Sequence, residues 1–191
     1  LRQPEETRLS LKKIRFQGGL LKRILYVGVP AGLQFVTFDL ANLLIQSGIN
    51  SFGDVAVAAW TAYVKTDSLT WMISGAFGVS VTTFVGQNFG AQKYDRIKAG
   101  VRMGVLLSIL IHIPLSAVEI FGGKRIASLM VTDPPVLELC RQYLLIVGIF
   151  VFFLGFLMVF RNCIQGMGNT WIPMLSGGLE VFSRLIFGYW L

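Results

Sequence analysis

The stretch Val136–Phe160, VLELCRQYLLIVGIFVFFLGFLMVF, decides the fold class of this chain. A helix needs about 20 mostly apolar residues to cross the hydrocarbon core of a bilayer, and this stretch is longer. Four more stretches of this kind fill most of the remaining chain: Ile24–Gly48, Val55–Gly86, Ile97–Phe121 and Thr170–Leu191. The sequence therefore predicts an all-α polytopic membrane protein with five transmembrane helices.

The composition agrees with a membrane protein. Apolar residues make up 54% of the chain and charged residues 14%, and the mean hydropathy is +0.66. Such values are outside the usual range of soluble domains. The net charge of +7 raises the question of nucleic acid, but the cations are concentrated in the gaps between apolar stretches. We therefore expect membrane lipids as partners and no nucleic acid.

The basic residues of these gaps also predict the orientation. Before the first stretch the chain carries Arg2, Arg8, Lys12, Lys13, Arg15, Lys22 and Arg23. The gap Ile49–Asp54 has no Lys or Arg, whereas the next gap has Lys93 and Arg96, and the gap after the fourth stretch has Arg161. By the positive-inside rule, the N-terminal side is cytoplasmic and the last stretch ends at the outer face. Lys124 and Arg125, in the third gap, are outnumbered exceptions to this pattern.

These observations give a domain organisation. We interpret residues 1–23 as a basic cytoplasmic linker and residues 24–191 as a transmembrane helical lobe. Because the chain begins at Leu1 and ends inside an apolar run, we expect it to be a fragment of a longer protein of the plasma membrane, as in the inner membrane of a bacterium.

Turn-forming residues mark the expected ends of the stretches. Asp133 and Pro134 suit the first turn of the fourth helix. Gly122 and Gly123 are expected to close the third helix, and Gly168 belongs to the turn before the fifth.

Ionisable residues inside a membrane span are costly, so each one needs a reason. Asp39 lies within the first stretch, with Asn42 on the same helical face and Gln34 nearby. This carboxylate is a candidate for holding Na⁺ or a titrating proton. The structural alternative is a polar contact to another helix. Pro30, nine residues earlier, would interrupt the helix, as happens beside ion sites in transporters.

Lys65 and Asp67 lie within the second stretch and point away from each other on a helix. Lys65 could pair with Asp39 if the first two helices pack antiparallel. An aqueous cavity would satisfy all three charged residues, and such a cavity suggests a transport pathway. The alternative is a neutralised structural ion pair.

Four further residues favour structural roles. Glu180 and Arg184 are spaced i,i+4, so they can neutralise each other. Glu119, near the outer end of the third stretch, is expected to reach the interface. His112 is expected to be a packing residue rather than a proton relay, because no acidic partner stands beside it in the sequence. The chain has no cluster with metal-ligand spacing and no phosphate-binding loop, so we expect neither enzymatic activity nor a cofactor.

Several motifs together resemble the multidrug and toxic compound extrusion (MATE) transporters. Gly86–Ala91, GQNFGA, looks like a hallmark of that family, and Gly28–Gln34, GVPAGLQ, looks like the start of its seventh helix. The run Ala58–Asp67 looks like the eighth helix, and Asp133–Leu144 resembles the approach to the tenth. Arg161 and the turn around Gly168, followed by Glu180 and Arg184, resemble the passage into the eleventh helix.

The resemblance implies a fold of twelve helices in two lobes, of which this chain would hold the linker and helices seven to eleven. It implies a cation-coupled antiporter, driven by Na⁺ or H⁺, that exports organic and often cationic compounds by alternating access. The N-terminal lobe of the same protein would be its partner. Asp39 falls close to the position of a family glutamate, whereas the fourth stretch has no acid between Gln142 and Phe160 to match its aspartate.

From these patterns we assign Asp39, Gln34, Asn42, Lys65 and Asp67 to the ion- or substrate-facing side. The residues Pro30, Gln87, Asn88, Gly90, Arg161, Gly168, Glu180 and Arg184 are expected to shape the structure. Two alternatives remain open. One is a flippase for lipid-linked precursors, which would need a wide cationic cavity. The other is a non-transporting membrane subunit, in which all intramembrane charges would be paired and dry.

Overall fold

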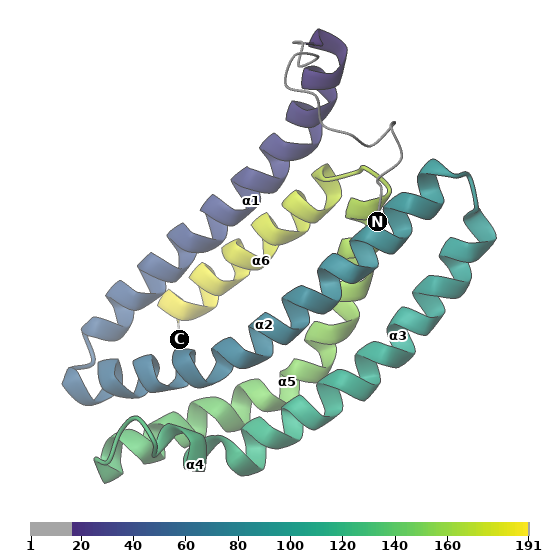
Figure 1. The fold of residues 1–191 in the computed structure, drawn as a ribbon. Coiled ribbons are helices and arrows are strands. Elements are labelled where there is room, and N and C mark those ends of the chain that lie inside the picture. The colour runs from purple at the N-terminus through teal and green to yellow at the C-terminus, as the bar shows by residue number, and fades with distance from the viewer. Residues whose placement is uncertain (1–16, 191) are drawn as a thin grey trace, which may run out of the picture.

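The computed structural model describes residues 17–190 of the 191-residue chain (Figure 1). The described range contains helices and connecting turns, with no strand. The helical elements are α1 (Gly18–Asn50), α2 (Asp54–Gly90), α3 (Tyr94–Ala117), the π-helical turn η3 (Val118–Gly122), α4 (Gly123–Ala127), α5 (Pro134–Gly166) and α6 (Trp171–Trp190). The predicted all-α fold is confirmed. Residues 1–16 of the predicted linker lie outside the described residues.

Four helical segments are long and apolar enough to cross a membrane: α1, α2, Tyr94–Ala127 and α5. Among the described helices, the fifth predicted span, α6, falls short of that composition, and its 20 residues include Glu180 and Arg184. Large apolar side chains cover the outer surface, and Phe35 and Phe121 are 71% and 83% exposed. An apolar exterior of this kind is typical of a surface that faces lipid. Together with the four spans, it makes the chain a multi-pass membrane protein.

Helix α5 is the centre of a bundle with α2 and α3. Its buried residues recur every three or four positions along one face: Val136, Cys140, Leu144, Gly148, Val151, Gly155, Val159 and Cys163. Glycine is required at two points of close approach. A Cβ at Gly155 would lie 2.7 Å from His112 Nδ1, and one at Gly166 would lie 2.7 Å from the Thr82 carbonyl oxygen. Small residues of this kind allow close helix packing in a membrane.

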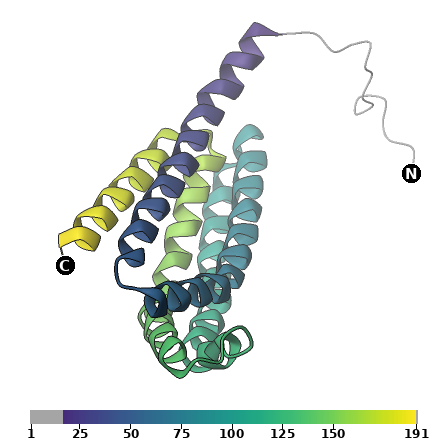
Figure 2. The same cartoon turned by 90° about the vertical axis from the view of Figure 1, so that its left-hand side faces the viewer.

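Helix α1 packs mainly against α6 rather than against the α2–α3–α5 bundle. Figures 1 and 2 show the two helices side by side. Gly177 of α6 makes this contact close, because a Cβ there would lie 3.2 Å from Gln34 Cγ and from Phe38 Cε2. Pro30 lies inside α1, and it is buried, as is Ala41 of the same helix.

One helix begins before its apolar stretch, and one predicted helix end is wrong. The first helix begins at Gly18, so residues 18–23 of the predicted linker are helical. Gly122 and Gly123 do not close the third helix, because both have right-handed helical backbone angles and the chain stays helical to Ala127. Gly123 serves packing instead: a Cβ there would lie 2.7 Å from Leu144 Cδ1. The expected turn at Gly168 is present, with a φ of +85°.

Candidate functional site

One face of α2 carries a buried acid with two hydrogen-bond donors. Asp67 is only 6% exposed. Tyr63, one turn before it, donates its hydroxyl to Asp67 Oδ2 at 3.3 Å, and Trp71, one turn after it, donates its indole N–H to the same oxygen at 2.9 Å. The i,i+4 spacing places all three side chains on one face of the helix. The two donors stabilise a negative charge on Asp67, whose carboxyl group is shielded from solvent.

Glu119 is a buried residue, so the prediction that it reaches the interface is wrong. It is 3% exposed and lies in the π-helical turn η3, where it accepts a hydrogen bond from the Thr70 hydroxyl of α2. Pro114 lies inside α3 one turn before η3. A proline removes one helical hydrogen bond, and π-helical turns often occur at functional sites. The wider turn carries Glu119 inward, toward α2.

Thr70 lies three residues after Asp67 on α2, so its hydrogen bond to Glu119 brings the Glu119 carboxyl group to the same face of the helix as Asp67. Across residues 17–190, no ion pair joins either of them to a Lys or Arg. The second carboxylate oxygen of Glu119, Oε2, is buried and has no hydrogen-bond donor. Two acids without a cation at this depth are costly. The arrangement can bind a proton or a small cation.

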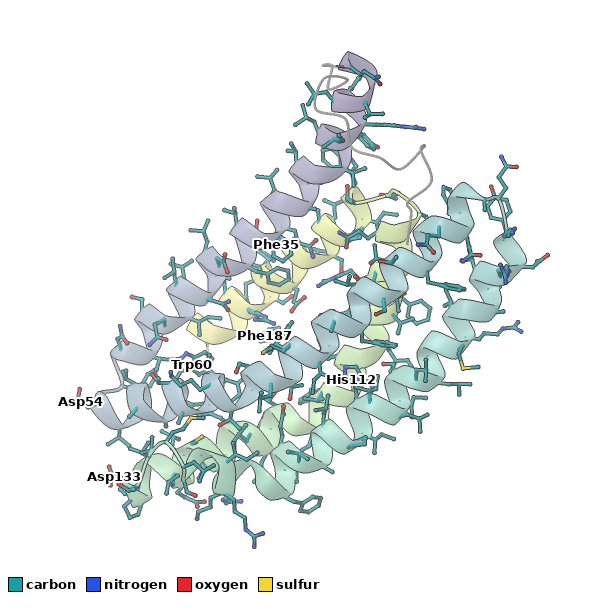
Figure 3. The ribbon with its side chains drawn as sticks, in the orientation of Figure 1. Phe35, Asp54, Trp60, His112, Asp133 and Phe187 are labelled. Atoms are coloured by element: carbon teal, nitrogen blue, oxygen red, sulfur yellow. The ribbon has the colours of Figure 1, made fainter. Side chains whose placement is uncertain are left out.

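His112, which is labelled in Figure 3, is buried on α3, and both of its ring nitrogens have hydrogen-bond partners, as the packing interpretation predicts. Its Nε2 is 3.0 Å from Ser74 Oγ, and its Nδ1 is 3.2 Å from Ser108 Oγ. The Ser74 hydroxyl also donates to the Thr70 carbonyl oxygen at 2.7 Å. A neutral imidazole meets these contacts when its Nε2–H donates to Ser74 and its Nδ1 accepts from Ser108.

Three aromatic rings adjoin the acid pair. The ring centroids of Trp60 and Tyr63 on α2 are 5.1 Å apart. The ring centroid of Tyr143 on α5 lies 5.8 Å from that of Trp60 and 5.7 Å from that of Tyr63. All three side chains are half-buried. Because the Tyr63 hydroxyl also bonds to Asp67, Tyr63 connects the aromatic cluster to this acid.

A second polar cluster joins α5 to α6. Glu180 accepts from Arg161 Nη2 at 3.2 Å and from Arg184 Nη2 at 2.7 Å. Both guanidinium groups lie over the ring of Phe38 on α1, at 5.7 Å and 6.0 Å from its centroid. The predicted Glu180–Arg184 pair is therefore present. The prediction that Arg161 stands in a gap between helices is wrong. Arg161 lies within α5, and its side chain is 10% exposed.

The other predicted site residues lie apart from the acid pair. Asp39 and Asn42 are exposed on α1, and Gln34 is half-buried against α6. Lys65 is exposed on α2, on a different face from buried Asp67. The possible Lys65–Asp39 pair is absent from the described part of the chain. The sequence thus singled out Asp67 as an intramembrane acid but did not predict that Glu119 lies buried against α2.

The GQNFGA motif forms the C-terminal end of α2. The Asn88 side chain donates to the Phe84 carbonyl oxygen at 2.8 Å, and the Asn88 carbonyl accepts from the Lys93 amide at 2.9 Å. Gln87 also accepts, from the Ala91 amide at 3.1 Å, and Gly90 is the last residue of the helix. The motif therefore shapes a helix end, as the sequence predicts.

Comparison with known proteins identifies the family of this chain. The MatE family model matches residues 30–190. A protein named "Probable multidrug resistance protein NorM" from Thermotoga maritima is 26% identical over 85% of this chain and 35% of its own length. A protein named "FAD transporter" from Shewanella oneidensis is 28% identical over 75% of this chain and 32% of its own length.

A solved structure shares the fold. It is a MOP superfamily transporter from Pyrococcus furiosus, with a TM-score of 0.80, 17% identity, and coverage of 92% of this chain and 41% of that one. The chain spans about a third of the length of the curated relatives it matches. The family model covers most of the chain, and the fold agrees with that match. The chain belongs to the MatE family of membrane transporters.

Proposed function

We propose that this chain is the C-terminal lobe of a cation-coupled antiporter that exports organic compounds across the plasma membrane by alternating access. Membership in the MatE family supports an efflux transporter. The relatives named above are a multidrug resistance protein and an FAD transporter, and this chain matches about a third of each. A second lobe of the same protein would supply the other wall of the transport pathway, and the α1 end at Gly18 would face the cytoplasm.

The observation that carries this proposal is the acid pair of Asp67 and Glu119. Both residues are buried within helices that are long and apolar enough to cross a membrane, and neither has a cationic partner among the described residues. Intramembrane acids without a cationic partner are typical of ion and proton pathways in pumps and transporters. A non-transporting subunit would instead pair its buried charges, so this alternative is disfavoured.

The neighbouring aromatic rings suit organic cations. Trp60, Tyr63 and Tyr143 present half-buried π-faces beside the carboxylates. Aromatic faces attract cations by about 0.5–2 kcal/mol, and more strongly when water is excluded. Asp39 and Asn42, exposed on α1, remain our candidates for a second ion- or substrate-facing group toward the other lobe.

A second candidate function is movement of a phosphate-bearing compound, such as a lipid-linked precursor. One observation favours it: Arg161 and Arg184 share the single carboxylate of Glu180, which leaves this cluster with a net positive charge. Guanidinium groups recognise phosphate well. The cluster would then attract anionic cargo, whereas the acid pair attracts cations.

The test is efflux of a fluorescent organic cation from cells that express the full-length parent protein. The Na⁺ and H⁺ gradients are collapsed separately. Loss of efflux with one gradient supports the antiporter and names its coupling ion. Unchanged accumulation of the dye under both gradients, with the protein confirmed in the membrane, would reject export of organic cations and favour phosphate-bearing cargo.

A further inference from the structure

We infer that the groove between the start of α3 and the end of α5 binds an anionic phospholipid, with an acyl chain in the groove and the phosphate on Lys98 and Arg102. The inference goes beyond the proposed function, because it concerns the surface that faces lipid and not the transport pathway. It takes from that proposal only the orientation, which puts this end of the bundle at the cytoplasmic leaflet. Neither the family match nor the relatives' names assign a lipid site to this chain.

The groove has an apolar floor and apolar walls. Its volume is about 460 Å³, within the range of about 300–1,000 Å³ that is usual for sites of small molecules. Ile97 of α3 and Cys163 of α5 form the floor, and both are buried in one apolar cluster. Phe160 and Met167 are exposed on either side of Cys163. The small thiol between two larger side chains leaves a depression that a hydrocarbon chain can fill.

Basic residues surround this groove. Residues 91–102 contain four cations and one acid, and all five are exposed: Lys93, Arg96, Lys98 and Arg102, with Asp95. Lys98 and Arg102 belong to the groove itself. The Lys98 Nζ lies 3.8 Å from Asp95 Oδ1, whereas Arg102 forms no ion pair within residues 17–190. An excess of cations beside a membrane span attracts the anionic headgroups of the cytoplasmic leaflet.

The two groove cations lie at the depth of the headgroups. They are spaced i,i+4 on one face of α3, about 6 Å and 12 Å along the helix from Tyr94, by the rise per residue of a helix. The end of α5 lies at the same end of the bundle, since a Cβ at Gly86 near the end of α2 would be 3.3 Å from the Gly166 carbonyl oxygen (Figure 1). Long basic side chains near a helix end extend toward the headgroups, and guanidinium groups recognise phosphate.

The apolar surface continues from the groove toward the middle of the membrane. Leu106 and Leu110 follow Arg102 at steps of four residues on α3, and both are exposed. On α5, Leu157 and Phe153 precede the groove and are exposed as well. An acyl chain that leaves the groove therefore meets apolar side chains on both helices. A phospholipid combines a phosphate with such a chain, so it fits this surface better than a free phosphate ion or an acidic protein.

Photocrosslinking in the reconstituted full-length protein locates the lipid. The probe is phosphatidylglycerol with a diazirine on one acyl chain, diluted into vesicles of phosphatidylcholine. The comparison uses phosphatidylcholine that carries the same diazirine. We expect phosphatidylglycerol to label the peptides of residues 97–102 and 160–167 more strongly. Equal labelling by the two lipids would overturn recognition of the headgroup. Absence of label from both peptides would overturn the groove as the site, as when the other lobe covers it.

Charge variants test the two groove cations. The full-length protein is released from vesicles of phosphatidylglycerol and phosphatidylcholine in equal amounts, and the bound lipid is measured by native mass spectrometry. The double variant Lys98→Gln, Arg102→Gln should retain roughly tenfold less phosphatidylglycerol than the wild type. The double variant Lys93→Gln, Arg96→Gln is the matched control, because it removes the same charge from the same exposed segment outside the groove.

The variants separate a built site from diffuse attraction. Equal losses in the two double variants would show general attraction to surface charge and overturn the site, as would full retention by Lys98→Gln, Arg102→Gln. Displacement of the lipid by excess inorganic phosphate would overturn the role of the acyl chain. Both experiments measure lipid and not transport, so their failure leaves the proposed antiporter standing, and a failed efflux test leaves the lipid site standing.

Discussion

Arg161 on α5 and Glu180 on α6 form an ion pair, with Nη2 3.2 Å from Oε2. The same carboxylate holds Arg184 of α6 at 2.7 Å, and Phe38 of α1 lies beneath both guanidinium groups. One acid thus links the α1–α6 pair to the bundle of α2, α3 and α5. The contact of α6 with α5 thus includes a partly buried ion pair, whereas α6 packs mainly against α1.

Glu180→Gln should destabilise the protein more than Arg184→Gln. The first change leaves two guanidinium groups without a carboxylate, whereas the second leaves Glu180 paired with Arg161. We expect a loss of about 2 kcal/mol for Glu180→Gln, reduced from the value of a fully buried pair because the side chain is partly exposed. Thermal unfolding in detergent, followed by circular dichroism, measures the difference. Equal losses would mean that Arg161 contributes nothing to the cluster.

Gly155→Ala should destabilise the packing of α5 on α3. The added methyl group would lie 2.7 Å from His112 Nδ1 and would also meet Ser108 Oγ. Overpacking of this kind costs about 1–3 kcal/mol. Gly75→Ala is the control, because a Cβ at Gly75 of α2 meets nothing within 4 Å and alanine favours a helix. The same unfolding measurement tests both. A neutral Gly155→Ala would show that the two helices can separate at no cost.

Asp39→Asn in the full-length protein should abolish gradient-driven efflux and leave expression intact. Asp39 is exposed on α1, so its replacement removes no buried contact of this lobe. Its negative charge within a membrane span is what we expect the other lobe or the transported ion to use. Asp54→Asn, at the start of α2, is the control. Wild-type efflux in the Asp39 variant would remove this residue from the mechanism.

Trp60→Leu should weaken binding of tetraphenylphosphonium by roughly fivefold, because one face of the aromatic surface is lost and a cation–π contact contributes about 1 kcal/mol. Phe150→Leu is the control, since Phe150 is 62% exposed on α5 and is not one of the three rings. Equilibrium binding to the purified full-length protein gives both affinities. Equal affinities of the two variants would place the cation elsewhere.

The sequence predicted those features of the site that lie on one helix. Asp67 was recognised as an intramembrane acid, and the pair Glu180–Arg184 follows from its i,i+4 spacing. Glu119 was assigned to the interface, because its position near the end of an apolar stretch gave no sign of a π-helical turn. Pro114 in the same stretch was the available signal.

The helix ends likewise include one that the sequence predicted and one that depends on a distant helix. Gly168 was correctly placed in a turn, since its left-handed backbone angle favours glycine. Gly122 and Gly123 were wrongly read as a helix end, because glycine at a helix end and glycine at a close helix contact look alike in sequence. The contact with Leu144 explains Gly123 only once α5 is in place.

By itself the sequence determined the membrane-spanning class, the approximate spans and the resemblance to a transporter family. These follow from the length of apolar runs, which must match the thickness of the hydrocarbon core, and from short local motifs. The tertiary structure alone decided that Glu119 meets Thr70, one turn after Asp67, and that Arg161 meets Glu180. Those meetings depend on the rotation and register of helices whose partners are distant in the chain, and packing against α5 and α6 fixes both.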